Sequence, residues 1–323
     1  MAGAGLVLSL LACPASAARS AAPKSTTPPE GAGLDGFTLP ENYKNADGSF
    51  NQEALVAQQK RRLDTINGKI GTKMRLAETP HYLIFSDADP ALSAQFVKWS
   101  EALYANLRSQ FAIDAKERVW DGKCLLMLFN GRPRFEQYSK VFDGHNVADA
   151  GAFFAWESYS DTAPQLVHIC IPLDDRDPQH LQELFAHEGT HAFFQLYRKP
   201  VELPLWLHEG LAEYMTVLNN PLLKPMKSSR AGPVARSPTP LDRLIGAATG
   251  DNLTLTDYSV SFTLVDFLVT TGKARFKKFV DLLKDGQDLD TALKTAYGFD
   301  SISLEIRWAT WMQQNEAGGV RRR

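Results

Sequence analysis

The segment His187-Glu188-Gly189-Thr190-His191 constrains this chain most, because it places two imidazoles and a carboxylate within about one turn of a predicted helix. That helix is expected over 178–198, where Asp177 suits the N-cap and Pro178 the first turn. Residues four apart share a helix face, so both histidines can bind a single metal ion while Glu188 reaches a water on that ion. Apolar residues cover most of the helical wheel and predict a buried helix.

An alternative interpretation makes these three ionisable side chains ordinary interior polar groups. Burying them without partners would cost about 1–3 kcal/mol for each unsatisfied group, and more for a charge. One divalent cation would satisfy all three together. Gly189 also argues against a purely structural helix, because a glycine in mid-helix costs up to about 1 kcal/mol. We therefore expect zinc, with one ion per chain.

A second helix, expected over 204–218, offers the remaining ligand. Glu209 and Glu213 share the face opposite its apolar side, which periodicity alone would assign to solvent. Two histidines need one more protein ligand and an open position for water, so we expect Glu209 to be that ligand. Glu213 is expected to fix the orientation of a ligand histidine. His208 is a minor alternative ligand, because it points about 100° away from Glu209.

These residues resemble a known family. His187-Glu188-x-x-His191, followed by Glu209 inside Trp206-Leu207-His208-Glu209-Gly210-Leu211-Ala212, is similar to the gluzincin metallopeptidases, the clan of thermolysin and aminopeptidase N. The aminopeptidase N branch has Asn where this chain has His208, and its gap before the glutamate is one residue longer. The strongest resemblance is to small secreted bacterial peptidase MA-like proteins. The recognisable motifs cover about residues 185–268.

The resemblance implies an α+β fold, in which a small mixed sheet with helices precedes a mainly helical second half that carries the metal site. It implies that Tyr258 stabilises an oxyanion, because that branch has a tyrosine at the corresponding helix start. An ordinary aromatic residue at a helix N-terminus is the alternative. Gly151, Ala152 and Phe153 match the edge strand that pairs with an extended substrate. An ordinary buried strand is the alternative there.

The implied activity is hydrolysis of bonds in a peptide or protein by a metal-activated water, with Glu188 as general base. Two other functions stay open. The first is a catalytically inactive protein that keeps the fold and serves as a binding module in the cell envelope. The second is a hydrolase that acts on non-peptide bonds, because a fold does not fix the substrate.

Composition is that of an ordinary globular protein and points to no nucleic-acid partner. Of 323 residues, 44% are hydrophobic and 22% charged, and the net charge is −2, so the chain lacks the basic balance of nucleic-acid or membrane-surface binders. The apolar run over 5–12 is too short for a stable membrane span. The sequence does not determine the oligomeric state.

That apolar run, followed by Ala15-Ser16-Ala17, predicts a signal peptide over 1–17 and export to the periplasm or the cell exterior. Lipoprotein anchoring through Cys13 is a minor alternative. Composition then predicts a flexible linker over 18–40, a metallopeptidase domain over 41–316 and a basic tail over 317–323.

Periodicity predicts alternating helices and strands before the metal helix. Cys124 and Cys170 lie in two predicted strands, so a disulfide and two buried free thiols are both open. The polar stretch over 224–240 is expected to be a loop beside the cleft. The expected helices cover 51–66, 90–111, 133–142, 258–271, 274–284, 289–297 and 301–315, and the expected strands 81–86, 123–129, 150–156 and 166–172.

Overall fold

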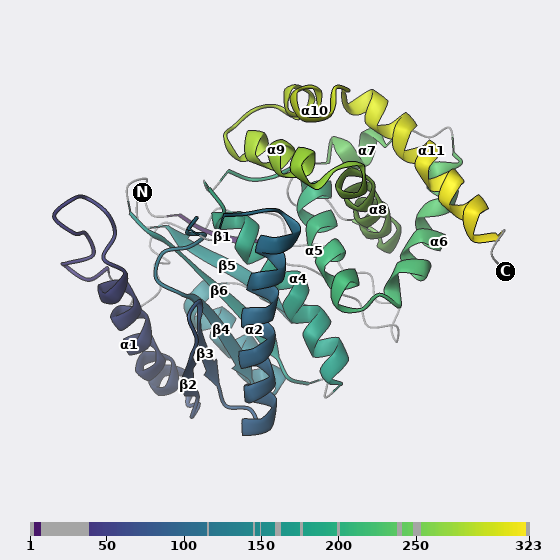
Figure 1. The fold of residues 1–323 in the computed structure, drawn as a ribbon. Helices are drawn as coiled ribbons and strands as arrows, with labels where there is room; N and C mark the ends of the chain where they lie inside the picture. Colours follow the sequence, from purple (N-terminus) through teal and green to yellow (C-terminus); the bar gives the residue numbers. More distant parts are fainter. Residues whose placement is uncertain are drawn as a thin grey trace. The chain divides into compact units, whose positions relative to one another are not determined.

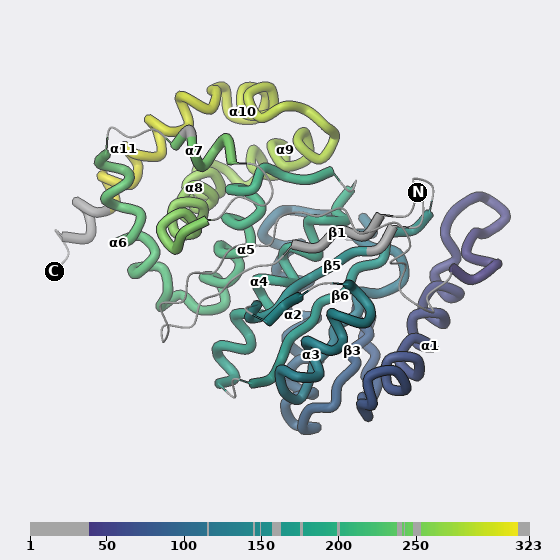
Figure 2. Tube along the Cα trace, turned by 180° about the vertical axis from the view of Figure 1, so that it is seen from behind, coloured from purple at the N-terminus to yellow at the C-terminus, as the bar shows by residue number. Residues whose placement is uncertain are grey.

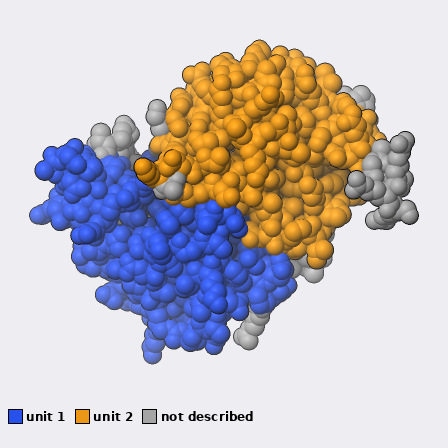
Figure 3. All heavy atoms as spheres, viewed as in Figure 1, with its two compact units in different colours: residues 1–106, 118–196 blue, residues 107–117, 197–323 orange. Residues whose placement is uncertain are grey.

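The computed structural model has an α+β architecture, as expected from the sequence. The chain divides into two compact units, coloured separately in Figure 3: unit 1 comprises Met1–Asn106 and Arg118–Leu196, and unit 2 comprises Leu107–Glu117 and Tyr197–Arg323. The residues described are 3–7, 39–114, 116–144, 146–148, 150–158, 163–174, 177–198, 201–237, 241–247 and 253–320.

Unit 1 is built on one mixed sheet with the strand order β1-β5-β6-β4-β3-β2 (Figure 1). Strands β3, β4 and β6 run parallel in its centre, and β1, β5 and β2 are antiparallel to their neighbours. Every residue of β3 and β4 is buried, as expected for parallel strands covered on both faces. The strands are β1 (Gly3–Val7), β2 (Arg75–Glu78), β3 (Tyr82–Ser86), β4 (Cys124–Phe129), β5 (Phe153–Ser158) and β6 (Gln165–Pro172).

Helices cover both faces of this sheet (Figures 1 and 2). On one face, α1 (Gln52–Ile70) and α3 (Arg132–Tyr138) pack into an apolar core with alternate residues of the strands. On the other face lie α2 (Pro90–Gln110) and α4 (Pro178–Leu196), where Phe185 of α4 contacts Tyr82 of β3 and Phe96 of α2 edge to face. The predicted metal helix therefore lies against the sheet and α2.

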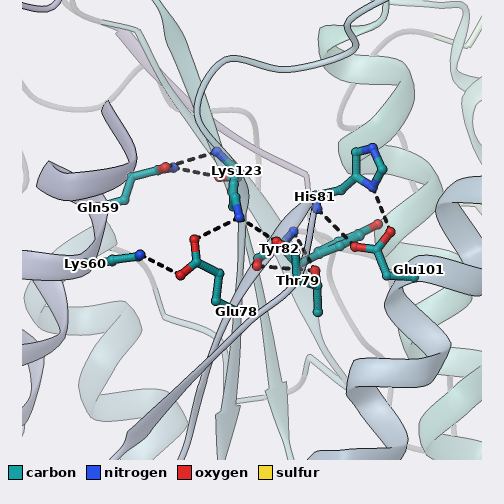
Figure 4. Close-up of polar contacts among 8 residues, drawn as sticks. All are labelled: Gln59, Lys60, Glu78, Thr79, His81, Tyr82, Glu101 and Lys123. Carbon is teal, nitrogen blue, oxygen red and sulfur yellow. Dashed lines mark hydrogen bonds and ion pairs between the residues drawn. The ribbon is translucent and has the colours of Figure 1, made fainter. Parts of the chain in front are cut away.

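A polar network at one end of the sheet fixes β2, which sequence analysis did not predict (Figure 4). The Lys123 ammonium donates to Glu78 at 2.9 Å and to the Thr79 carbonyl at 2.5 Å. Lys60 of α1 pairs with the other oxygen of Glu78 at 2.5 Å. The Gln59 amide closes the network by bonding both backbone groups of Lys123, at 2.6 and 3.0 Å. These bonds connect α1, β2 and the start of β4.

The two described cysteines are free and buried. Strands β4 and β6 are neighbours, and Met127 of β4 pairs with Cys170 of β6. Cys124 is three residues from Met127, and side chains alternate between faces along a strand, so the two thiols point to opposite faces of the sheet. Of the two alternatives left open by the sequence, the structure has free thiols. Burial raises the pKa of both well above the usual thiol range.

Unit 2 contains the helices of the second half. The Thr254 side chain and Asp257 form a reciprocal capping box at the start of α8. Gln313 and Trp308 of α11 bond the Ala235 carbonyl and the Thr263 hydroxyl, at 3.0 and 3.1 Å. The helices are α5 (Leu205–Asn219), α6 (Leu223–Ala235), α7 (Asp242–Ile245), α8 (Leu255–Thr271), α9 (Lys273–Lys284), α10 (Leu289–Tyr297) and α11 (Ser301–Val320).

The predicted loop over 224–240 is wrong, because residues 224–235 belong to helix α6 (Leu223–Ala235). Pro225 lies in the first turn, where a backbone N–H has no partner in the helix, and Pro233 lies in the last turn. Neither proline interrupts the middle of the helix, which buries Lys227 and Ala231. No helix among the described residues is long and apolar enough to cross a membrane.

Several predictions about the ends of the chain lie outside the described residues. These are the cleavage site near Ala17, Cys13, nearly all of the linker over 18–40, and 321–323 of the basic tail. Gly3–Val7, inside the predicted signal peptide, forms strand β1.

Candidate metal centre

Helix α4 buries its central residues completely. His187, Glu188 and His191 each have 0% exposure. The Thr190 hydroxyl between them donates to the Ala186 carbonyl at 2.6 Å, which satisfies it within the helix. Three ionisable side chains therefore share one fully buried turn of this helix, where an uncompensated carboxylate would carry a large desolvation cost.

Gly189 has a packing role in this helix. A Cβ at this position would lie 2.5 Å from a methyl group of Leu103 on α2. The absence of a side chain allows α2 and α4 to approach closely. The glycine is thus explained by packing, and the sequence argument that used it against a purely structural helix is wrong.

The two imidazoles converge on one point. Their Nε2 atoms are 3.1 Å apart, and the rings are nearly perpendicular, at 85°. Phe154 of β5 stacks on the His191 ring with centroids 5.5 Å apart, which fixes its plane. Two nitrogens about 2.05 Å from one tetrahedral ion would be roughly 3.3 Å apart, so the pair fits a shared zinc. An N–H···N bond would also fit this distance if one ring carried its proton on Nε2.

In unit 2, α5 buries the residues predicted to complete the site. Glu209 is 2% exposed, Glu213 1% and His208 9%. The face that looked solvent-exposed by periodicity is therefore buried. A Cβ on Gly210, which follows Glu209, would lie 2.5 Å from the Ser261 carbonyl oxygen of α8. The glycine allows α8 to pack directly against this part of α5.

Sequence analysis missed Lys227, a buried residue of α6 that forms an ion pair with Glu213. The side chain of Lys227 is 9% exposed and that of Glu213 1%, so the pair is largely shielded from solvent. Lys227 lies fourteen residues after Glu213, a separation that does not correspond to neighbouring positions on one helix or strand. The lysine was hidden because its segment was predicted to be a loop.

Tyr258 lies in the first turn of α8, and its backbone N–H donates to the Thr254 carbonyl at 3.1 Å. Its side chain is half-buried. The prediction of a tyrosine at a helix start is confirmed, whereas its role toward an oxyanion stays a prediction.

The predicted edge strand differs in position and extent. Strand β5 begins at Phe153, so Gly151 and Ala152 precede it. Its outer side pairs antiparallel with β1, in the register Val7 to Phe154 and Leu6 to Ala155. In this structure β5 is the second strand rather than the edge, because residues 3–7 occupy the hydrogen-bonding positions expected for a substrate.

The second half of the chain is similar in sequence to a peptidase family. A family model described as the Peptidase MA superfamily matches residues 164–314, a range that includes α4 and α5. No curated protein matches. Among solved structures, the chain is similar to an M1 zinc metallopeptidase from Deinococcus radiodurans, with 13% identity and a TM-score of 0.41. That match covers 74% of this chain and 51% of the other, so the chain spans about half the length of the structure it resembles.

Proposed function

We propose that this chain is a zinc-dependent hydrolase of peptide bonds, with His187, His191 and Glu209 as the metal ligands. The observation that carries the proposal is the 3.1 Å separation of the two histidine Nε2 atoms on a helical turn that also buries Glu188. The similarity of residues 164–314 to the Peptidase MA superfamily supports it. The donor set of two imidazoles and one carboxylate is one that catalytic zinc sites use.

Zinc, when bound, supplies a Lewis acid that acidifies water and polarises a carbonyl group. Glu188 accepts the proton of the attacking water and then donates it to the leaving amine. Its complete burial suits this role, because a carboxylate shielded from bulk water exchanges its proton with the reacting groups and not with solvent. Tyr258 donates a hydrogen bond to the developing oxyanion.

Glu213 supports the ligand set from one turn beyond Glu209. Its carboxylate is held by the Lys227 ammonium, and a carboxylate oxygen can also accept a hydrogen bond from an imidazole N–H. This gives Lys227 an indirect role, because its ion pair places the Glu213 carboxylate.

The test combines metal analysis with peptidase assays on the purified chain. We expect wild-type protein to cleave members of a peptide library and to lose that activity in a chelator. Glu188→Gln should keep zinc and lose at least 100-fold in turnover, the lower end of a general base's contribution. His187→Ala should lose both zinc and turnover.

His180→Ala is the matched control, because His180 lies on the same helix outside the motif. We expect it to keep zinc and activity. Unchanged peptidase turnover in Glu188→Gln would refute the mechanism. Zinc bound without turnover on any peptide would favour the binding module, and turnover only on other bonds would favour the non-peptide hydrolase.

A further inference from the structure

A second group of metal-ligand side chains lies in unit 1, on the face of the sheet opposite α4. His168 and Cys170 are two residues apart on β6 and so point to the same face. Asp143 ends a short π-helix, η1 (Ser139–Asp143), that follows α3. One donor atom from each of the three lies within 4.8 Å of the others. Sequence analysis missed this group, because Asp143 lies 25 residues from His168 and only the fold brings them together.

The geometry within the group is tight. The His168 Nε2 atom lies 3.2 and 3.3 Å from the two carboxylate oxygens of Asp143. The side chains are buried, with His168 at 2% and Asp143 at 6% exposure. Cys170 is 0% exposed. Donors about 2.0 to 2.3 Å from one tetrahedral zinc would be roughly 3.3 to 3.6 Å apart, which the nitrogen and oxygen atoms nearly match as they stand.

The surroundings of the group are apolar. The core on this face contains Met127, Phe135 and Phe153, together with Cys170 itself. The rings of Tyr138 and Phe153 meet His168 edge-on, at 80° and 77°, and fix the plane of the imidazole. An Asp–His hydrogen bond accounts for two of the three polar side chains. It does not account for a thiol brought to the same point.

The π-helix supplies an independent reason to regard Asp143 as specifically placed. A π-turn inserts one extra residue per turn, is rare, and is frequent at functional sites. Here it ends at Gly144, which adopts a left-handed conformation with φ of 71°. The π-helix directly follows α3 and places the Asp143 carboxylate beside the His168 ring.

The charges are compatible with a divalent ion. A carboxylate and a thiolate together balance two positive charges. Arg62, a buried cation, donates from Nη2 to the Tyr138 hydroxyl at 3.1 Å.

We propose that Asp143, His168 and Cys170 form a second transition-metal site, for zinc or a similar ion, that ties the π-helix to β6. Binding breaks the S–H bond of Cys170, releases its proton to solvent and forms a metal–thiolate bond, with no change of oxidation state. The chain would then hold two ions rather than one. This site shares no residue with the proposed hydrolytic site and does not depend on it.

The chemical difference between the two sites gives a direct test. The proposed hydrolytic site has no sulfur ligand, so a thiolate-to-cobalt charge-transfer absorption in the chain loaded with Co²⁺ reports only on a cysteine. All variants would carry Cys13→Ser, which leaves Cys124 and Cys170 as the remaining thiols. We expect the absorption in this background and two equivalents of metal per chain.

Cys124→Ser is the matched control, because Cys124 is also a buried free thiol but points to the other face. It should keep the absorption, whereas Cys170→Ser should lose it together with one equivalent of metal. Asp143→Asn retains the thiol and covers the case in which Cys170→Ser fails to fold. We expect its cobalt affinity to fall at least tenfold.

His187→Ala should retain the charge-transfer absorption while losing the other equivalent, which separates failure of this proposal from failure of the hydrolytic site. A chain that folds, binds a single equivalent and shows no such absorption would overturn the second site. Loss of the absorption in Cys124→Ser but not in Cys170→Ser would overturn it too.

Discussion

Gly210→Ala tests the close approach of α5 and α8 in unit 2. A Cβ built on Gly210 would lie 2.5 Å from the Ser261 carbonyl oxygen, 2.7 Å from a methyl group of Val265 and 2.9 Å from the Ser261 carbonyl carbon. Ordinary contacts begin at 3.4 Å, so the obstructing oxygen is too close by 0.9 Å. It belongs to a helix backbone, which cannot rotate away as a side chain can.

The size of the effect follows from two opposing contributions. Overpacking that forces a backbone shift costs about 1–3 kcal/mol. Alanine in mid-helix returns up to about 1 kcal/mol relative to glycine. We therefore expect Gly210→Ala to lower the free energy of unfolding by about 1–2 kcal/mol.

Gly189→Ala is the matched comparison, because this glycine is also in mid-helix and also meets an atom at 2.5 Å. That atom is a methyl group of Leu103, the end of a flexible side chain. The propensity gain is the same, so the loss in stability should be smaller than for Gly210→Ala. Urea unfolding followed by circular dichroism gives both free energies. The reasoning is refuted if Gly210→Ala is as stable as wild type, or more stable than Gly189→Ala.

Three further predictions concern unit 2. Burial lowers the pKa of Lys284 to about 7 from a usual 10.5, so the folded state binds fewer protons than the unfolded state between these values and this residue makes stability rise with pH. Lys284→Met should remove this dependence, which amounts to up to about 5 kcal/mol between the two pKa values. Urea unfolding at several pH values between 7 and 10 measures it, and an unchanged slope of unfolding free energy against pH in the variant would contradict the lowered pKa of Lys284. Lys227→Met removes the ammonium partner of the buried Glu213 and should lower the free energy of unfolding by about 3–5 kcal/mol. Adding Glu213→Gln should recover part of that loss, and equal stability of the single and double variants would count against the ion pair. Thr254→Ala removes the side-chain half of the capping box and should cost about 1 kcal/mol in thermal unfolding, whereas Thr254→Ser should cost little.

Most of the long elements could be predicted from sequence, because their apolar periodicity extends over many residues. Helix α4 was expected over 178–198 and spans Pro178–Leu196. Strand β2 was missed because it is short, and three of its four residues are exposed. Helix α6 was missed because Pro225 and Pro233 resemble loop signals, although Pro225 lies in the first turn, where a helix tolerates proline, and Pro233 only in the last turn.

The candidate site was predictable only in part. The spacing of His187 and His191 fixes a shared helix face, and the structure brings their Nε2 atoms together. Periodicity assigned Glu209 and Glu213 to solvent, because it measures apolar contrast within one helix and contains no information about the helices that pack against it. The burial of both depends on segments distant in sequence.

The tripeptide His-Glu-Gly occurs twice, at 187–189 and at 208–210. In both copies a Cβ on the glycine would lie 2.5 Å from an atom of a neighbouring helix, α2 in unit 1 and α8 in unit 2. The glutamate before each glycine is buried, at 0% and 2% exposure. A helix packed directly against the glycine backbone helps to exclude water from the adjacent carboxylate, which strengthens its electrostatic interactions. A substitution that moves the neighbouring helix away from either glycine should therefore admit water to Glu188 or Glu209, which the proposed reaction needs shielded from solvent.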